Sequence, residues 1–187
     1  MLKTIQEVLR TGNATVKYPF APLVRPKDAR GKPEHNSENC FACSACAIAC
    51  PPNAIQTVVD LEAGTKTWSI NYGRCVYCGR CEEVCPSDAI RLSTEFELAV
   101  MNRADLEETC VYSLQACSEC GEFFAPRKAV DYAEKILSWR LAGGGERSND
   151  EEMRLAHETI RLCMGCKQRH DAYRAWEKSR QAGELLC

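Results

Sequence analysis

The spacing of apolar residues predicts helices near both ends of the chain. At the start, apolar residues recur with helical spacing up to Gly12, which predicts a short amphipathic helix over residues 2–10 (Leu2, Ile5, Val8 and Leu9). Near the other end, residues 127–141 carry one continuous apolar face and form the strongest predicted helix. Asn149 or Asp150 is expected to cap a second helix that runs to about Leu162. The charged tail that follows is also predicted to be helical.

The central part of the chain has the composition of short strands. Residues 55–59 and 67–70 are rich in β-branched and aromatic side chains and are separated by a glycine-containing turn, so they predict a hairpin. Residues 89–92 and 96–100 are predicted to form a second pair of strands. Residues 103–108 are predicted to be helical.

An extended arm separates the first helix from the rest of the chain. Residues 17–23 contain two prolines, which push their predecessors toward extended geometry and exclude a continued helix. The helix and the arm are too short to build a core of their own. They pack either on the chain's own centre or on a partner subunit, and we favour the partner because exposed apolar segments commonly mark interfaces.

Length and charge narrow the function classes. The chain has 187 residues, enough for one domain and a smaller second one. Lys and Arg (24) nearly balance Asp and Glu (26), and without a basic block nothing indicates nucleic-acid binding. No apolar run has the length of a membrane span, and the start of the chain lacks the features of a secretory signal. Any membrane association is therefore expected to be peripheral or through a partner.

Eight of the fourteen cysteines fall into two copies of one pattern. Each copy reads C-x-x-C-x-x-C-x-x-x-C-P, and the copies are offset by 35 residues. This is the ligand run of two-cluster bacterial ferredoxins, in which soft thiolates hold [4Fe–4S] clusters. A structural zinc or disulfide site is the alternative, but ligand spacing of this kind favours metal, reduced thiols and the cytoplasm. The copies are Cys40, Cys43, Cys46 and Cys50, and then Cys75, Cys78, Cys81 and Cys85.

The fourth cysteine of each copy is expected to serve the cluster of the other copy. Three cysteines spaced by two residues wrap around one cluster, whereas the fourth is too close in sequence to turn back to it. The first set is therefore Cys40, Cys43, Cys46 and Cys85. The second set is Cys50, Cys75, Cys78 and Cys81. Crossed ligation ties the two halves together, so neither half is expected to fold well without both clusters.

Two further C-x-x-C pairs lie toward the C-terminus. They predict a tetrahedral site of four thiolates, here called the C-terminal set (Cys117, Cys120, Cys163 and Cys166). Zinc is the expected metal, and a single rubredoxin-like iron is the alternative. The 42 residues between the two pairs exceed the usual spacing of about 15–20, and the predicted helical hairpin fills the gap. Thioredoxin-like redox pairs are a weaker interpretation because no βαβ frame surrounds either pair.

The remaining cysteines and histidines match no ligand pattern. Cys110 and Cys187 are expected to be ordinary thiols, and His35 and His157 to be surface residues. His170 follows the last C-x-x-C pair, but four cysteines already complete the predicted site.

These elements predict an α+β protein built around a two-cluster bacterial ferredoxin-like domain. The expected divisions are an N-terminal helix and arm over residues 1–29 and the ferredoxin domain over residues 30–101. A helical, metal-binding extension, closed by the four-cysteine site, is expected over residues 102–187.

Several motifs together resemble one protein family. The doubled cysteine motif, the preceding Arg30-Gly31-Lys32-Pro33 and the loop from Cys75 to Pro86 are similar to the small iron–sulfur subunit of membrane-bound [NiFe] hydrogenases. The resemblance is to the component H type of hydrogenase-4, to its sister in formate hydrogenlyase, and more broadly to the two-cluster subunit of respiratory complex I. Residues 18–22 of the arm, and residues 124–126 after the first C-x-x-C pair of the C-terminal set, also resemble this family. It covers most of residues 1–130 and weakens beyond 141, where the last C-x-x-C pair has Met-Gly in place of the family's Pro-Glu.

The resemblance implies a role in electron transfer, without a catalytic site of the chain's own. Electrons would pass between an electron-input iron–sulfur subunit and the small and large [NiFe] subunits, with the chain held on the inner face of the cell membrane by those partners. The equivalent subunit of a quinone-reducing complex I relative and a free soluble ferredoxin are the alternatives. A free ferredoxin needs only about the middle third of this chain. A zinc-dependent nucleic-acid binder is disfavoured by the absence of net positive charge.

Overall fold

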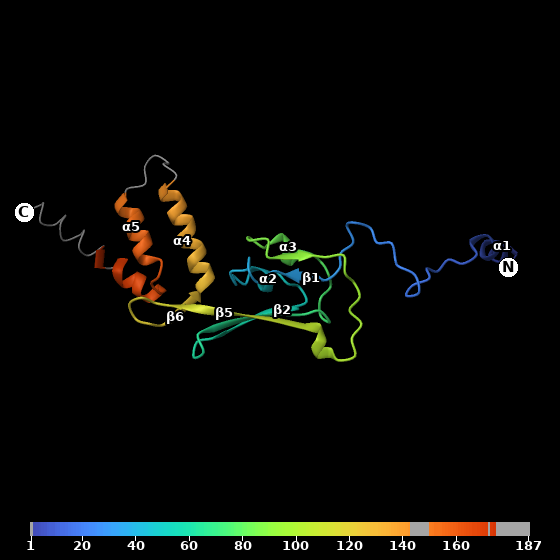
Figure 1. Ribbon diagram of the computed structural model, residues 1–187, viewed down its shortest axis with the longest axis horizontal. Coiled ribbons are helices and arrows are strands. Elements are labelled where there is room, and N and C mark those ends of the chain that lie inside the picture. Colours follow the sequence, from blue (N-terminus) through green and yellow to red (C-terminus); the bar gives the residue numbers. More distant parts are fainter. Residues whose placement is uncertain (1, 143–149, 172, 175–187) are drawn as a thin grey trace, which may run out of the picture.

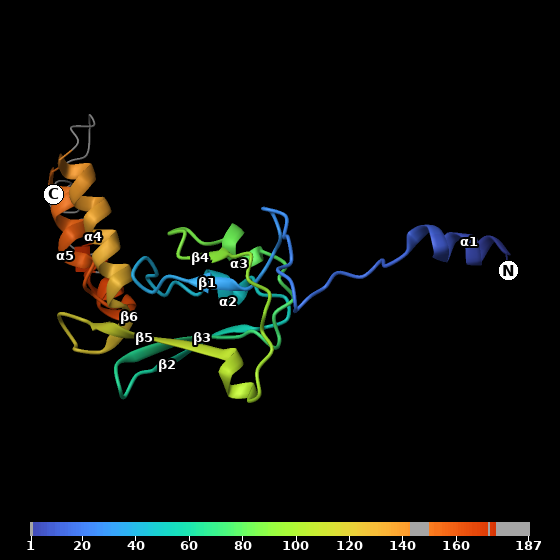
Figure 2. The same cartoon turned by 45° about the vertical axis from the view of Figure 1, so that its right-hand side comes forward.

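The computed structural model describes residues 2–142, 150–171, 173 and 174. Figures 1 and 2 show three parts along the long axis of the molecule. Helix α1 (Leu2–Thr11) lies at one end, two small sheets lie in the middle, and helices α4 and α5 lie at the other end. None of the helices in the described part of the chain combines the length and the apolar character that crossing a membrane requires.

Helix α1 confirms the first predicted helix, and its end has a local cause. Gly12 adopts a positive φ of 58° and donates its N–H to the carbonyl of Val8, which closes the last turn. Every residue of α1 is exposed. The arm that follows does contact the chain's own centre, since the hydroxyl of Tyr18 donates to Glu97 and its ring lies 6.0 Å from that of Phe96. The arm is therefore anchored on the centre, while α1 packs against no other described element.

The larger sheet is antiparallel and has the strand order β2-β3-β5-β6. Strands β2 (Ile55–Asp60) and β3 (Thr65–Asn71) form the predicted hairpin. Strand β5 (Glu107–Ala116) pairs with β3 along its length, and β6 (Phe123–Pro126) completes the sheet. This sheet continues past residue 101, so the expected C-terminal extension begins inside it.

Two predictions for the centre were wrong. Residues 96–100 form no strand; instead β4 (Ile90–Leu92) pairs with β1 (Pro33–His35), which the sequence pattern did not indicate. The expected helix over residues 103–108 is a single 3₁₀ turn, Arg103–Leu106, and the chain then enters β5. Both errors concern pairing with a strand distant in sequence, which overrides local preference.

The core of the centre lies between the larger sheet and two one-turn helices, α2 (Ala45–Ile48) and α3 (Arg80–Glu83). Trp68 on β3 is only 1% exposed and is the largest of the fully buried side chains. The buried residues packed together there are Ala42, Ile55, Trp68, Ile70, Tyr72, Cys81, Ile90 and Tyr112. Four cysteines of the doubled motif pack against this group, so the metal-ligating loops rest directly on the core (Cys40, Cys46, Cys50 and Cys85).

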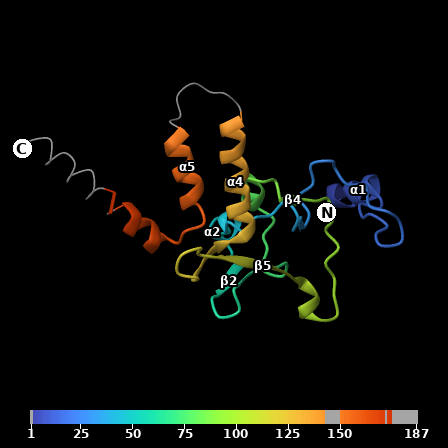
Figure 3. The same cartoon turned by 60° about the vertical axis from the view of Figure 1, so that its left-hand side comes forward.

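Helices α4 (Arg127–Ala142) and α5 (Asp150–Thr159) lie side by side as the predicted hairpin. Figure 3 shows the pair in profile. Helix α4 confirms the strongest helix prediction, whereas α5 ends at Thr159, before the expected Leu162. The hydroxyl of Thr159 donates to the carbonyl of Leu155, and the chain turns soon afterwards. The expected cap at Asn149, Cys187 and most of the predicted helical tail lie outside the described residues, although residues 164–171 are helical.

Candidate metal centres

The two cysteine loops repeat each other in backbone conformation as well as in sequence. Three pairs of residues with positive φ occur at the same offset of 35 (Ala42 and Tyr77, Ser44 and Gly79, Asn53 and Asp88). This left-handed conformation is uncommon for residues other than glycine, so its recurrence indicates a shared structural demand. The bends turn backbone N–H groups toward sulfur.

The N–H to sulfur hydrogen bonds occur in matching pairs. Those of Ala42 and Tyr77 reach Cys40 and Cys75 over 3.4 Å each. Those of Ala54 and Ala89 reach Cys50 and Cys85 over 3.2 Å each. Hydrogen bonds from N–H groups stabilise thiolates and metal-bound sulfur, so the loops are prepared for a charged sulfur ligand.

The fourth cysteine of each repeat lies with the other loop. Burial raises the pKa of the Cys46 thiol, and the nearby thiols of Cys40, Cys43 and Cys85 raise it further. Burial likewise raises the pKa of Cys75, to which Cys50 and Cys78 contribute. Cys85 is therefore close enough to the first loop to affect its thiols, and Cys50 lines one cavity with the three thiols of the second loop.

The second set surrounds one small cavity. All four of its members line this cavity, together with apolar residues from both repeats such as Pro33, Ile55 and Leu92 (Cys50, Cys75, Cys78 and Cys81). Burial raises the pKa of Cys81 to about 11. Buried thiols around an apolar cavity fit a group that replaces their protons, and four soft thiolates are the donor set of an iron–sulfur cluster.

The C-terminal set converges more tightly. Its four sulfur atoms all lie within 4.8 Å of one another (Cys117, Cys120, Cys163 and Cys166). The sulfur of Cys117 is 3.7 Å from that of Cys166, and the sulfur of Cys120 is 3.6 Å from that of Cys163. Thiolates at a Zn–S distance of about 2.3 Å in a tetrahedron are separated by about 3.8 Å. The observed spacing thus fits a single tetrahedral ion.

Backbone and side-chain groups around the C-terminal set favour thiolates. Backbone N–H groups, first that of Cys120 and also that of Cys163, lower the pKa of Cys117 to about 6. The guanidinium of Arg169 lies 2.9 Å from the sulfur of Cys166. His170 does not join the sulfur atoms, because its Nε2 lies 3.0 Å from a carboxylate oxygen of Glu119. A positive charge beside the site partly balances the negative charge that four thiolates bring to a divalent ion.

The prediction that His35 is a surface residue was wrong. Its ring stacks on the buried Trp68 with the ring centroids 3.9 Å apart. Its Nδ1 lies 3.6 Å from the sulfur of Cys110, and its Nε2 lies 3.4 Å from the hydroxyl of Tyr112. Burial lowers the pKa of His35. The sequence did not indicate this position because His35 lies in β1, a three-residue strand that is recognised only by its pairing with β4. His157 is exposed, as expected.

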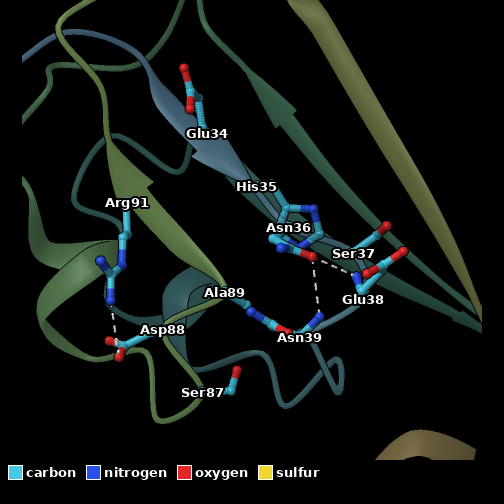
Figure 4. Close-up of a pocket in the computed structure, with 10 residues that line it drawn as sticks. All are labelled: Glu34, His35, Asn36, Ser37, Glu38, Asn39, Ser87, Asp88, Ala89 and Arg91. Carbon is cyan, nitrogen blue, oxygen red and sulfur yellow. Dashed lines mark hydrogen bonds and ion pairs between the residues drawn. The ribbon is translucent and has the colours of Figure 1, made fainter.

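A polar hollow lies beside His35, between β1 and the segment leading into β4 (Figure 4). Asn36 accepts hydrogen bonds from the N–H groups of Glu38 and Asn39 through its side chain. Its carbonyl accepts the N–H of Cys40. No cysteine lines this hollow. The hydrogen bonds of Asn36 hold the loop that leads into the first set.

Comparison with known proteins places these features in a family. The 4Fe-4S dicluster domain family matches residues 39–89. The chain is 40% identical over 168 residues to formate hydrogenlyase subunit 6 of Escherichia coli K12, covering 90% of this chain and 89% of that protein. It is 36% identical over 65 residues to NADH-quinone oxidoreductase subunit I of Cytophaga hutchinsonii, which covers 32% of this chain and 37% of that protein.

Solved structures include a partial match to the membrane-bound sulfane sulfur reductase, an archaeal respiratory membrane complex. The match has a TM-score of 0.43 and 25% identity, and covers 55% of this chain and 56% of that one. The family assignment depends instead on the sequence relationship that spans nearly the whole chain. On that relationship, the chain belongs to the family of formate hydrogenlyase subunit 6, an iron–sulfur protein family with a 4Fe-4S dicluster domain.

Proposed function

We propose that this chain is an electron-transfer subunit of a membrane-associated [NiFe] hydrogenase or formate hydrogenlyase complex. The observation that supports the proposal most directly is the exchange of Cys50 into the second loop, where it lines one cavity with Cys75, Cys78 and Cys81. Such an exchange is the ligand arrangement of two-cluster ferredoxins. The family relationship over 90% of the chain supports the same conclusion.

In this proposal the first set and the second set each hold one [4Fe–4S] cluster. When bound, the two clusters supply one-electron transfer without a substrate site. The chain's residues rest thiols of both loops on a shared core, direct N–H groups at sulfur and cover the second set with apolar side chains. Hydrogen bonds and limited solvent access are the means by which a protein sets the potential of such a site.

The C-terminal set is proposed to hold one zinc ion. The sulfur–sulfur distances of 3.6 and 3.7 Å support a tetrahedral ion, and a closed shell of four thiolates leaves no position for a substrate. Its contribution would be structural, since the ion would join the β5–β6 connection to the segment that follows α5, where Phe124 already packs against the buried group that contains Leu162. The alternative is a single iron, and an X-ray absorption edge at this site distinguishes the two: a zinc edge is expected, and an iron edge would overturn the assignment.

Two observations support partner subunits for this chain: its family relationship and the exposed apolar face of α1. Other hydrogenase subunits, namely the small and large [NiFe] subunits and an electron-input iron–sulfur subunit, would hold the chain on the inner face of the cell membrane. The exposed apolar face of α1 suits such an attachment (Leu2, Ile5, Val8 and Leu9). Deleting residues 1–25 is expected to release the chain from its complex with both clusters retained, whereas assembly that survives the deletion would contradict this role.

The direct test of the proposal is cluster content. Anaerobically purified chain is expected to contain iron and acid-labile sulfide in equal amounts, in the quantity of two [4Fe–4S] clusters, with zinc at a separate site. A preparation with zinc alone at the eight central cysteines would overturn the proposal. The equivalent subunit of a complex I relative is the second candidate, favoured by the match to subunit I, but that match covers only 32% of the chain.

A further inference from the structure

The two cluster sites have the same backbone but different side-chain surroundings. As described above, the backbone N–H to sulfur hydrogen bonds of one repeat have counterparts of equal length in the other. Equal backbone contributions raise both potentials alike. Side chains that the repeat does not share can therefore make the two potentials differ.

The side-chain donors converge on the first set. The indole N–H of Trp68 donates to the sulfur of Cys46 over 3.4 Å. The hydroxyl of Ser87 lies 3.7 Å from the sulfur of Cys85. Two of the four members of the first set thus have a side-chain N–H or O–H group within hydrogen-bond distance of their sulfur.

A cation lies near the same set. The ammonium of Lys66 donates to the carbonyl of Ala42 over 2.8 Å, inside the first loop. Burial lowers the pKa of Lys66, while the thiolates of the same loop oppose that change (Cys43, Cys40 and Cys46). A partly buried cation is less screened by solvent than an exposed one.

The second set has fewer such groups. No side-chain donor to its sulfur atoms is found within the part of the chain that the structure describes. Arg30 donates to the carbonyl of Cys78 over 3.0 Å, but its guanidinium is exposed and therefore screened. Burial raises the pKa of Cys81, and the backbone N–H of Glu82 partly opposes this rise. The side chain of Glu82 is a carboxylate, so this residue adds a negative charge and no side-chain donor. Apolar residues and the ring of Tyr77 make up most of the remaining surroundings.

We propose that the first set is the higher-potential site of the pair, and that the indole N–H of Trp68 is the main cause. This inference builds on the proposed function, because it presupposes a cluster in each set. Reduction adds negative charge, which N–H and O–H donors and a nearby cation stabilise, so these groups favour the reduced form. Trp68 is the strongest candidate because it is 1% exposed, and water cannot replace its hydrogen bond.

The test is a redox titration, followed by EPR, of the full chain with both clusters, in which two reduction steps are expected. Trp68→Phe keeps an aromatic ring against His35 but removes the donor. It is expected to lower the equilibrium constant of the higher-potential step about tenfold, a shift of about 59 mV for one electron. The lower step should not move. The matched control is Trp139→Phe, which changes an indole that is 75% exposed on α4 and should move neither step.

Two further variants assign the steps and keep the test decisive if Trp68→Phe loses its cluster. Ser87→Ala removes the hydroxyl beside the Cys85 sulfur, and Lys66→Met removes the cation beside the first loop; both are expected to lower the same step. An unmoved higher step, or a shift confined to the lower step, would overturn the inference. Iron and sulfide analysis of the same samples separates the two proposals, because loss of the two-cluster content in the unmodified chain contradicts the proposed function itself.

Discussion

The cysteine-rich centre and the C-terminal hairpin bring thiols together in different ways. In the centre, three thiols of the second loop and Cys50 of the first repeat line one cavity, and we propose that Cys85 completes the first loop in the same way. In the C-terminal set, two short segments far apart in sequence contribute two thiols each, and all four lie within 4.8 Å of one another. The tight group suits one ion, whereas the loops around a cavity suit a larger group.

This difference determines which metal site is affected when one cysteine ligand is lost. The two central sets share their loops, so the loss of one ligand affects a site formed mainly by the other repeat. The C-terminal set shares no ligand with the centre. It is joined to the centre by the continuous sheet and by α4, where the rings of Tyr132 and Phe41 stack 5.0 Å apart and Lys128 donates to the carbonyl of Ser37. Because the two regions share no ligand, metal loss from one is expected to leave the metal of the other in place.

The largest effect is expected from Cys50→Ser. This change removes a thiolate from the second set, although Cys50 follows the first loop in sequence. About half of the iron should be lost, and the EPR signal of the second set should disappear while that of the first set remains. Cys110→Ser, a cysteine outside all three sets, is the control and should keep both signals. Loss of the first signal instead would show that the ligands are not crossed.

Next in size is the effect of Cys163→Ser on the C-terminal set. An open shell binds the ion more weakly, so zinc should be lost and residues 117–166 should exchange their amide hydrogens faster. Both central sets should keep their iron. Treating the unmodified chain with a chelator that removes only zinc should produce the same faster exchange. Loss of iron on either treatment would mean that the two regions are not independent.

A smaller effect is expected from Leu162→Ala. Leu162 is 7% exposed and packs with the cysteines of the C-terminal set. Truncating a buried leucine costs about 2–4 kcal/mol of unfolding free energy, here confined to the C-terminal region. Denaturation followed by Tyr and Trp fluorescence, with zinc content checked, measures the change. Met164→Ala, at a residue that is 69% exposed, is the matched control and should have almost no effect.

The smallest effect is expected from Glu134→Gln on α4. Arg161 contacts the Glu134 carboxylate through two nitrogens, at 2.5 and 2.8 Å, and lowers the pKa of this carboxyl. A lowered folded-state pKa stabilises the fold above the ordinary glutamate value, and this stabilisation is lost as pH falls through the folded-state pKa. The variant should be slightly less stable at pH 7, and the difference should vanish in acid. A difference that persists at low pH would exclude the ion pair as its cause.

The sequence alone determined the features that depend on near neighbours. The spacing of the cysteines specified the two loops, and the apolar periodicity of residues 127–141 specified α4. The β-branched residues on either side of a short turn specified the hairpin of β2 and β3. Each of these is set by contacts within one segment, where composition and periodicity are sufficient evidence. The sequence relationship to formate hydrogenlyase subunit 6 bears out the family suggested by the motifs.

Only the tertiary structure decided which distant segments meet. The predicted helix over residues 103–108 is limited to one 3₁₀ turn because β5 begins at Glu107, where β3 offers it a partner. Strand β1 exists because β4 pairs with it, and that pairing brings His35 onto Trp68. The donor from Trp68 to Cys46 joins residues from two elements, and no periodicity reports such a contact. Long-range pairing and side-chain direction depend on how the whole chain packs, so local patterns do not contain them.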